Sequence, residues 1–258
     1  MNWTHFPWIF GSAALCWALA SCLSGKWLIR LAFAGTVVVA AFIAGLWWSL
    51  DRPPMRTLGE TRLWFGLLLP ASGLLIHRFV PWKWPLVVST GMALLFLGIT
   101  LAKPETHDRT LMPALQSPWF VPHVVIYMMA YAFLCHTALT SICYTWISRK
   151  NPGRAESALP IVEASLWVGF GLLTLGLLCG AVWAKEAWGH YWTWDPKETW
   201  AFLTWGCYLL YFHLQPVWRK NPRSALFFLA LASVTVFLCW FAVNAMPSAA
   251  QSVHTYTG

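Results

Sequence analysis

Long apolar runs separated by short polar breaks are the main pattern of this chain. Eight runs are about 18 residues or longer, at 7–24, 31–50, 63–80, 84–102, 123–147, 160–184, 199–217 and 225–245. A helix of about 20 apolar residues crosses the roughly 30 Å hydrocarbon core of a bilayer. The pattern therefore predicts an all-α fold, a polytopic bundle of about eight transmembrane helices that forms a single integral membrane domain over 1–258.

Composition and charge agree with a membrane location. Hydrophobic residues make up 59% of the chain and charged residues only 10%, against roughly 25% charged residues in soluble domains. The net charge of +8 falls on one set of connections, which the positive-inside rule assigns to the cytoplasmic side. These cations are Lys26, Arg30, Arg78, Lys83, Arg149, Lys150, Arg154, Arg219, Lys220 and Arg223. Both termini and the segment 185–198 are then expected on the outer side, and the basic balance needs no nucleic-acid partner.

The segment WGHYWTWDPKETW at 188–200 concentrates aromatic rings next to a helix start. Asp195 is a candidate N-cap, Pro196 suits the first helical position, and Glu198 has the spacing of a capping box. An interfacial aromatic belt is one interpretation, because Trp and Tyr are enriched at membrane–water boundaries. The other is a flat platform beside a helix N-terminus, for a large planar ligand with carboxylates such as a porphyrin, or for a quinone.

The eight histidines allow the porphyrin interpretation to be examined, because haem iron takes axial imidazoles. His123 and His254 come from distant segments, and both are expected on the outer side, where they could bind iron above and below a porphyrin. His77, His136 and His213 lie deep in apolar runs, where each is either a ligand or a partner in an interhelical hydrogen bond. The seven cysteines lie within or at the ends of apolar runs, without a C-x-x-C pair, so they are expected to be buried thiols.

Four stretches together resemble a known family. WGHYWTWDPKETWAF is close to a signature of the form WG-x-YW-x-WDPKE. LMPALQSPWFVPHVVIYMMAYA around His123, SVHTYTG around His254 and RPPMRTLGETRLW at 52–64 resemble three outer regions of the same family. Over residues 52–258 the chain is similar to the CcsA (also called ResC) cytochrome c biogenesis proteins. These belong to a haem-handling superfamily named for its tryptophan-rich WWD motif.

The resemblance implies a haem-handling subunit of a cytochrome c synthase in the bacterial inner membrane, with the WWD segment 185–198 on the periplasmic face. Such proteins take haem b from the inner side and hold it at an external site. They present it to apocytochrome c, where thioethers form with a CxxCH sequence. On this chain the implied external iron ligands are His123 and His254, and the implied embedded ligand is His213. The implied platform consists of Trp188, Trp192, Trp194 and Asp195.

The resemblance also implies what other molecules contribute. The attacking thiols belong to the acceptor, so no catalytic residue is expected in this chain. A second ligand for embedded haem is expected from a CcsB (ResB) partner, with His77 and His136 as weaker local candidates. Two other functions stay open: a cytochrome b-like quinol electron-transfer subunit, and a transporter that binds no haem.

Overall fold

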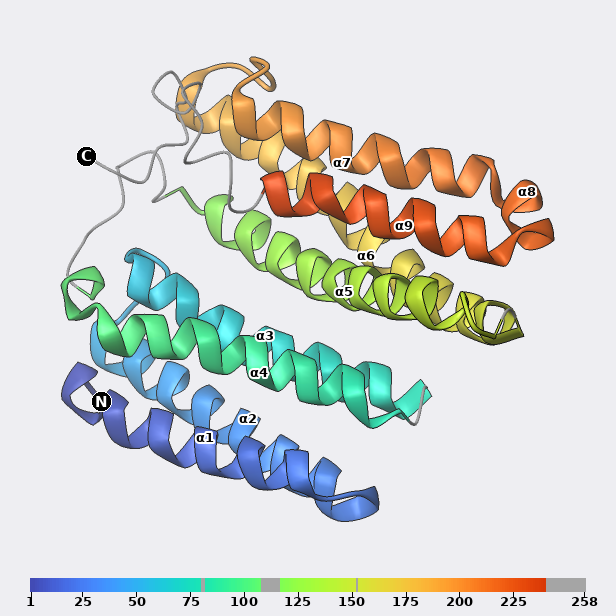
Figure 1. Ribbon diagram of the computed structural model, residues 1–258. Coiled ribbons are helices and arrows are strands. Elements are labelled where there is room, and N and C mark those ends of the chain that lie inside the picture. The colour runs from blue at the N-terminus through green and yellow to red at the C-terminus, as the bar shows by residue number, and fades with distance from the viewer. Residues whose placement is uncertain (80–81, 108–116, 152, 240–258) are drawn as a thin grey trace. The chain divides into compact units, whose positions relative to one another are not determined.

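The computed structural model describes residues 1–79, 82–107, 117–151 and 153–239 (Figure 1). Every regular element in these ranges is helical, so the predicted all-α fold is confirmed. The helices form two compact units, Met1–Gln116 and Ser117–Gly258. The single membrane domain expected from the sequence stays a prediction, and so does the outer location of the two termini.

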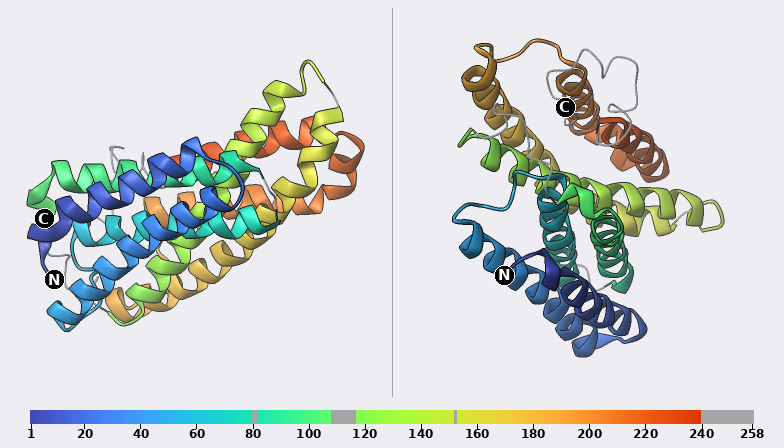
Figure 2. Two further views of the ribbon diagram at one scale, coloured as in Figure 1. Left: turned by 90° about the horizontal axis from the view of Figure 1, so that it is seen from below. Right: turned by 90° about the vertical axis from the view of Figure 1, so that its left-hand side faces the viewer.

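The first unit consists of four long helices lying alongside one another (Figures 1 and 2). They are α1 Phe6–Cys22, α2 Gly25–Leu50, α3 Leu58–Phe79 and α4 Lys83–Ala102, with the short turns η1 Trp3–His5 and η2 Pro104–Thr106. α1 packs against α2 and α4, while α3 packs against the same two helices. The buried Trp17 donates from Nε1 to the carbonyl of Ala32 at 3.1 Å, and its ring lies against Gly35. A side chain at Gly35 would separate α1 from α2.

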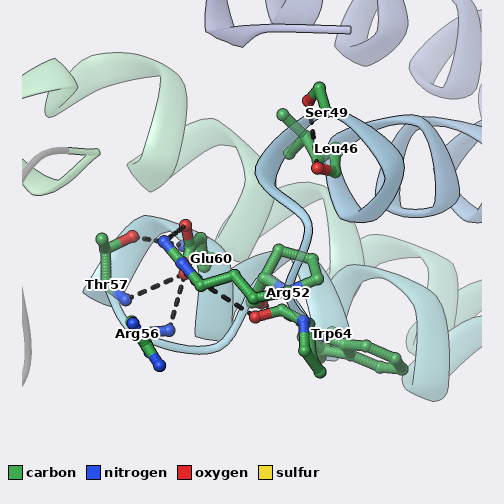
Figure 3. A network of polar contacts seen from close by, with 9 residues as sticks. Leu46, Ser49, Arg52, Arg56, Thr57, Glu60 and Trp64 are labelled. Carbon is green, nitrogen blue, oxygen red and sulfur yellow. Dashed lines mark hydrogen bonds and ion pairs between the residues drawn. The ribbon is translucent and has the colours of Figure 1, made fainter.

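A buried carboxylate orders the connection between α2 and α3 (Figure 3). Glu60 is only 2% exposed and accepts two hydrogen bonds from the Arg52 guanidinium, at 2.9 and 3.0 Å. It also accepts from the backbone N–H groups of Arg56 and Thr57, while its own N–H donates to Thr57 Oγ1. This reciprocal arrangement is a capping box. The connection is therefore fixed by hydrogen bonds and by one ion pair.

The second unit contains the tryptophan-rich segment 185–198. Its helices are α5 Phe120–Ile147, α6 Gly153–Trp188, α7 Pro196–His213, α8 Gln215–Lys220 and α9 Pro222–Phe237. α9 packs against α5, α6 and α7, and α6 contacts both α5 and α7 (Figure 1). Glu163 on α6 accepts hydrogen bonds from Tyr211 at 2.9 Å and Gln215 at 3.3 Å. This carboxylate ties the end of α7 to α6.

Each of the eight apolar runs overlaps a helix in the described residues, but the helices differ in their suitability as membrane spans. Run 199–217 is divided at Leu214 between α7 and α8, and the end of run 225–245 lies outside the described residues. Within the described ranges, four helices are long and apolar enough to cross a membrane. They are Gly25–Leu50, Lys83–Ala102, Phe120–Ile147 and Ala155–Trp188. Helix α1 has 17 residues, which rise only about 25 Å, so the expected count of about eight spans stays a prediction.

Candidate functional site

The WWD segment begins where α6 ends. Gly189 follows the last helical residue, Trp188, with φ of +85°, a left-handed conformation that glycine adopts without steric cost. Lys185 donates from Nζ to the Gly189 carbonyl at 2.8 Å, and its ammonium lies 5.4 Å from the centre of the Tyr191 ring. Glycine and lysine together end the helix and turn the chain into the segment.

The segment ends at the predicted capping box of α7, which is confirmed. The Asp195 side chain accepts from the Lys197 N–H at 2.9 Å, and Pro196 is the first helical residue. Glu198 accepts from the N–H groups of Asp195 at 3.1 Å and Thr193 at 2.9 Å. Asp195 is 6% exposed, so its carboxylate is a structural acceptor within the turn. The backbone just before α7 is thereby held in place.

Trp194 lies in this turn with φ of +60°, in a region that residues other than glycine seldom adopt. Such a conformation costs on the order of 1–3 kcal/mol and persists only where the surroundings enforce it. Here Thr199 Oγ1 donates to the Trp194 carbonyl at 3.1 Å, next to the capping box. The ring itself is 62% exposed. The capped turn therefore holds a large apolar ring out of the protein interior.

Two of the predicted platform tryptophans lie beside α7. The rings of Trp192 and Trp194 are 5.7 Å apart at 87°, so one presents its edge to the other instead of sharing a plane. Both rings also contact Phe202, which stacks on Trp205. The Nε1–H of Trp192 is buried and has no acceptor among the described residues. These two rings form an L-shaped surface with a buried, unused donor.

The third platform tryptophan, Trp188, lies in another aromatic group. Its ring packs edge-on against Trp183 at 4.7 Å, and Trp183 stacks on the His123 ring at 5.4 Å and 21°. His123 belongs to α5, whereas both tryptophans belong to the last turns of α6. The structure thus brings the predicted ligand His123 into the same group as Trp188, with Trp183 between them.

The His123 imidazole is oriented by a hydrogen bond to the backbone of α6. Its Nδ1 lies 3.0 Å from the carbonyl oxygen of Gly176. A carbonyl only accepts, so Nδ1 carries the proton and the lone pair of the neutral ring is on Nε2. Histidines that bind metals usually donate their other N–H to a carbonyl or carboxylate in this way. The geometry is that of a prepared nitrogen ligand.

The other predicted ligands are in different situations. His254 lies outside the described residues. His213 is exposed on the last turn of α7, and His77 is half-buried with Nδ1 2.9 Å from the Trp82 carbonyl. His136 is 3% exposed, and neither ring nitrogen has a hydrogen-bond partner in the described parts of the chain. The ligand roles of all four stay predictions.

Lys197 places a cation at the start of α7. Its side chain is half-buried, and desolvation lowers the pKa of the ammonium to about 8, although the nearby Asp195 carboxylate opposes the change. The Lys197 carbonyl also accepts a long contact from Cys239 Sγ at 3.9 Å. Near neutral pH this group is still mostly charged, and its charge is sensitive to small changes in pH.

Sequence reasoning missed several residues that build this site. Gly176, Gly180 and Trp183 hold His123, while Phe202 and Trp205 support the rings of the segment. The spacing Gly-x-x-x-Gly at 176–180 was a usable signal, because small residues four apart allow close helix contact in membranes. The partners of the aromatic residues on α6 and α7 had no comparable signal.

Comparisons with known proteins identify the family. The family described as cytochrome C assembly protein matches residues 58–250. A cytochrome c biogenesis protein CcsA from Oryza sativa is 34% identical over 85% of this chain and 83% of its own. CcsA proteins from Mesostigma viride and Synechococcus sp. (strain WH7803) are 27% and 26% identical, over 85% and 93% of this chain and 82% and 87% of their own.

The family match over residues 58–250 covers the WWD segment, His123 and all of α5 to α9. The apolar helices and the relatives together indicate an integral membrane protein with a role in cytochrome c biogenesis. Because the family match covers most of the chain and the relatives share one name, the chain belongs to the cytochrome c assembly protein family, as a relative of the CcsA cytochrome c biogenesis proteins.

Proposed function

We propose that this chain is the haem-handling subunit of a cytochrome c synthase in the bacterial inner membrane. It relays haem b to the segment 185–198 on the periplasmic face, where His123 and His254 are the axial ligands. It then presents the haem to the CxxCH sequence of an apocytochrome c. The observation that carries the proposal is the His123 imidazole, which is fixed in the tautomer that metal ligands adopt beside the tryptophan-rich segment.

Two further features fit a porphyrin. Trp188, Trp192 and Trp194 offer large apolar rings, and aromatic rings pack well on a flat macrocycle. The buried Nε1–H of Trp192 has no acceptor among the described residues, and a bound carboxylate would supply one. Haem b has both the flat body and the carboxylates.

The start of α7 contributes to anion binding through side chains more than through the helix backbone. The capping box already occupies backbone donors with the carboxylates of Asp195 and Glu198. A haem propionate therefore cannot use those same N–H groups. We assign propionate binding to the Lys197 ammonium and to Trp192 Nε1, while Asp195 shapes the turn that carries them.

Thioether formation explains why the site needs no nucleophile of its own. In each attachment the acceptor's thiol adds across a vinyl group: sulfur bonds to one vinyl carbon and a proton goes to the other, so no oxidant is needed. The residues of this chain hold and orient the substrate haem. Fixed orientation of two reacting groups can lower a barrier by several kcal/mol, on the order of 7–11 at best.

A CcsB (ResB)-like membrane protein is the proposed partner. His213 is exposed on the last turn of α7, on a surface that another protein can reach. This supports the idea that His213 and a partner histidine bind an embedded haem together. The relay would then run from that embedded site to the external site at His123.

The test is the haem content of the full chain purified with its partner, together with maturation of a reporter cytochrome c. We expect His123→Ala and His254→Ala to lose the external haem and the maturation activity. His5→Ala is the matched control, an exposed histidine whose side chain bonds only to Asn2 in the described structure. Unchanged haem and maturation in both ligand variants would contradict the proposal. Haem lost only in His136→Ala, with reversible reduction by quinol, would favour the electron-transfer alternative.

A further inference from the structure

The contact between α5 and α6 pairs two large side chains with two glycines. His123 lies opposite Gly180, and Tyr127 lies opposite Gly176. His123 and Tyr127 are four residues apart on α5, and Gly176 and Gly180 are four residues apart on α6. Consecutive turns of α5 therefore contact consecutive turns of α6. The glycine pair therefore forms a groove that receives a histidine and a tyrosine.

The groove has no room for a larger residue. A Cβ on Gly180 would lie 2.7 Å from His123 Cε1 and 2.8 Å from Nδ1, and a Cβ on Gly176 would lie 2.6 Å from the Tyr127 ring. The imidazole is further confined by Trp183, which stacks on it, and by Tyr127, whose ring meets it at 4.8 Å and 62°. His123 thus has one well-defined orientation.

That orientation separates the two ring nitrogens. Nδ1 enters the groove and lies 3.0 Å from the Gly176 carbonyl. Nε2 would be 3.6 Å from a Cβ at Gly180, so it points away from the groove more than Nδ1 does. A helical Cβ leans toward the preceding turn, so a side chain at Gly180 would also cover the Gly176 carbonyl.

We propose that Gly176 and Gly180 are positioning residues for the haem ligand: the Gly176 carbonyl fixes the Nδ1–H tautomer of His123, and the missing side chain at Gly180 allows that hydrogen bond to form. The inference rests on the proposed function, because it assumes that His123 binds haem iron through Nε2. It assigns to the backbone of α6 the role that a carboxylate or carbonyl has behind many metal-binding histidines.

The first test compares Gly180→Ala with Gly171→Ala in the full chain and its partner. Gly171 is on the same helix, and no described atom beyond its own stretch of helix backbone lies within 4 Å of its Cβ position, so its variant controls for an added methyl group on α6. We expect Gly180→Ala to reduce haem affinity about 10- to 100-fold, the usual effect of losing a ligand's supporting contact. Added imidazole should restore the haem absorbance, and Gly171→Ala should behave as wild type.

The second test leaves Gly176 and Gly180 unchanged. It can therefore be carried out even if the Gly180→Ala protein accumulates poorly. In His123→Gly the cavity can admit imidazole, which donates to the Gly176 carbonyl, or 1-methylimidazole, which has no N–H to donate. We expect imidazole to restore the haem absorbance at a concentration at least about tenfold lower than 1-methylimidazole requires. Equal rescue by the two compounds would overturn the inference.

The two proposals fail differently. Wild-type protein without haem, or His123→Ala with its full haem content, would refute the proposed function itself. Haem lost in His123→Ala but fully retained in Gly180→Ala would refute only the positioning role of the glycines.

Discussion

The carboxylates of Asp195 and Glu198 both accept hydrogen bonds from backbone N–H groups at the start of α7, and together they form a capping box. Asp195 accepts from the N–H of Lys197 at 2.9 Å, and Glu198 accepts from the N–H of Asp195 at 3.1 Å. Asp195→Ala removes the first of these bonds, and loss of such a cap costs about 1 kcal/mol. We expect a lower unfolding midpoint in detergent and faster proteolysis of the segment 189–195.

The conservative variant separates the cap from the charge. Asparagine caps helices about as well as aspartate, so Asp195→Asn should keep most of the stability that Asp195→Ala loses. Equal destabilisation by the two variants would mean that the carboxylate charge, and not the cap, holds the turn.

Features that depend on neighbouring residues could be predicted from the sequence. The capping box at Asp195 involves residues within four positions, and each apolar run overlaps at least one helix in the described part of the chain. The hydrogen-bond partner of His123 could not be predicted. The Gly176 carbonyl is 53 residues away in the sequence, and only the register of α5 against α6 brings the two groups together. The Gly-x-x-x-Gly spacing in one sequence does not determine which helix packs against those glycines.

The shape of the tryptophan platform was also beyond local reasoning. Trp188 still belongs to α6, but Gly189 turns the chain away, so Trp192 and Trp194 reach the side of α7. A single flat surface was expected, whereas the Trp192 and Trp194 rings are perpendicular. The positive φ angles of Gly189 and Trp194 determine this perpendicular arrangement. A glycine in the sequence indicates that a positive φ is allowed, whereas a tryptophan gives no such indication.

Trp192→Phe should change the stability of the haem-free protein little but should clearly weaken haem binding. The buried Nε1–H has no acceptor among the described residues, and such a group costs about 1–3 kcal/mol. Without haem, removing this donor should offset much of the stability lost with the smaller ring. With haem, losing a bond to a charged propionate, worth about 1.5–3 kcal/mol, should weaken binding about 10- to 100-fold.

Trp205→Phe is the matched comparison for this prediction. It removes the same ring atoms, but Trp205 Nε1 donates to Thr174 Oγ1 at 2.9 Å. We expect it to lower the unfolding midpoint of the haem-free protein more than Trp192→Phe does. Haem titrations and thermal melts of both variants measure the difference, and identical behaviour would remove the case for a propionate at Trp192.

Haem retention should fall as the pH rises through about 8. Burial lowers the pKa of the Lys197 ammonium to about 8, so the group is charged below this pH and neutral above it. At pH 9 roughly one molecule in ten keeps the charge, and a neutral amine attracts a propionate weakly. Lys197→Arg keeps its charge at both values, so its retention should change little between pH 7 and pH 9. A wild-type profile as flat as that of Lys197→Arg would exclude Lys197 from propionate binding.

Glu60→Gln should destabilise the first unit. The Glu60 carboxylate is 2% exposed and accepts four hydrogen bonds. The amide nitrogen of glutamine would face donors instead of accepting from them, which costs about 1–3 kcal/mol for each buried group left unsatisfied. Because the Arg52 side chain is 23% exposed, water can solvate part of its charge, and the cost should stay below that of breaking a fully buried ion pair. The control is Glu105→Gln, at an exposed position beside α4. Thermal unfolding in detergent should show a lower midpoint for Glu60→Gln alone, and equal shifts in the two variants would mean that the buried network in Figure 3 adds no stability.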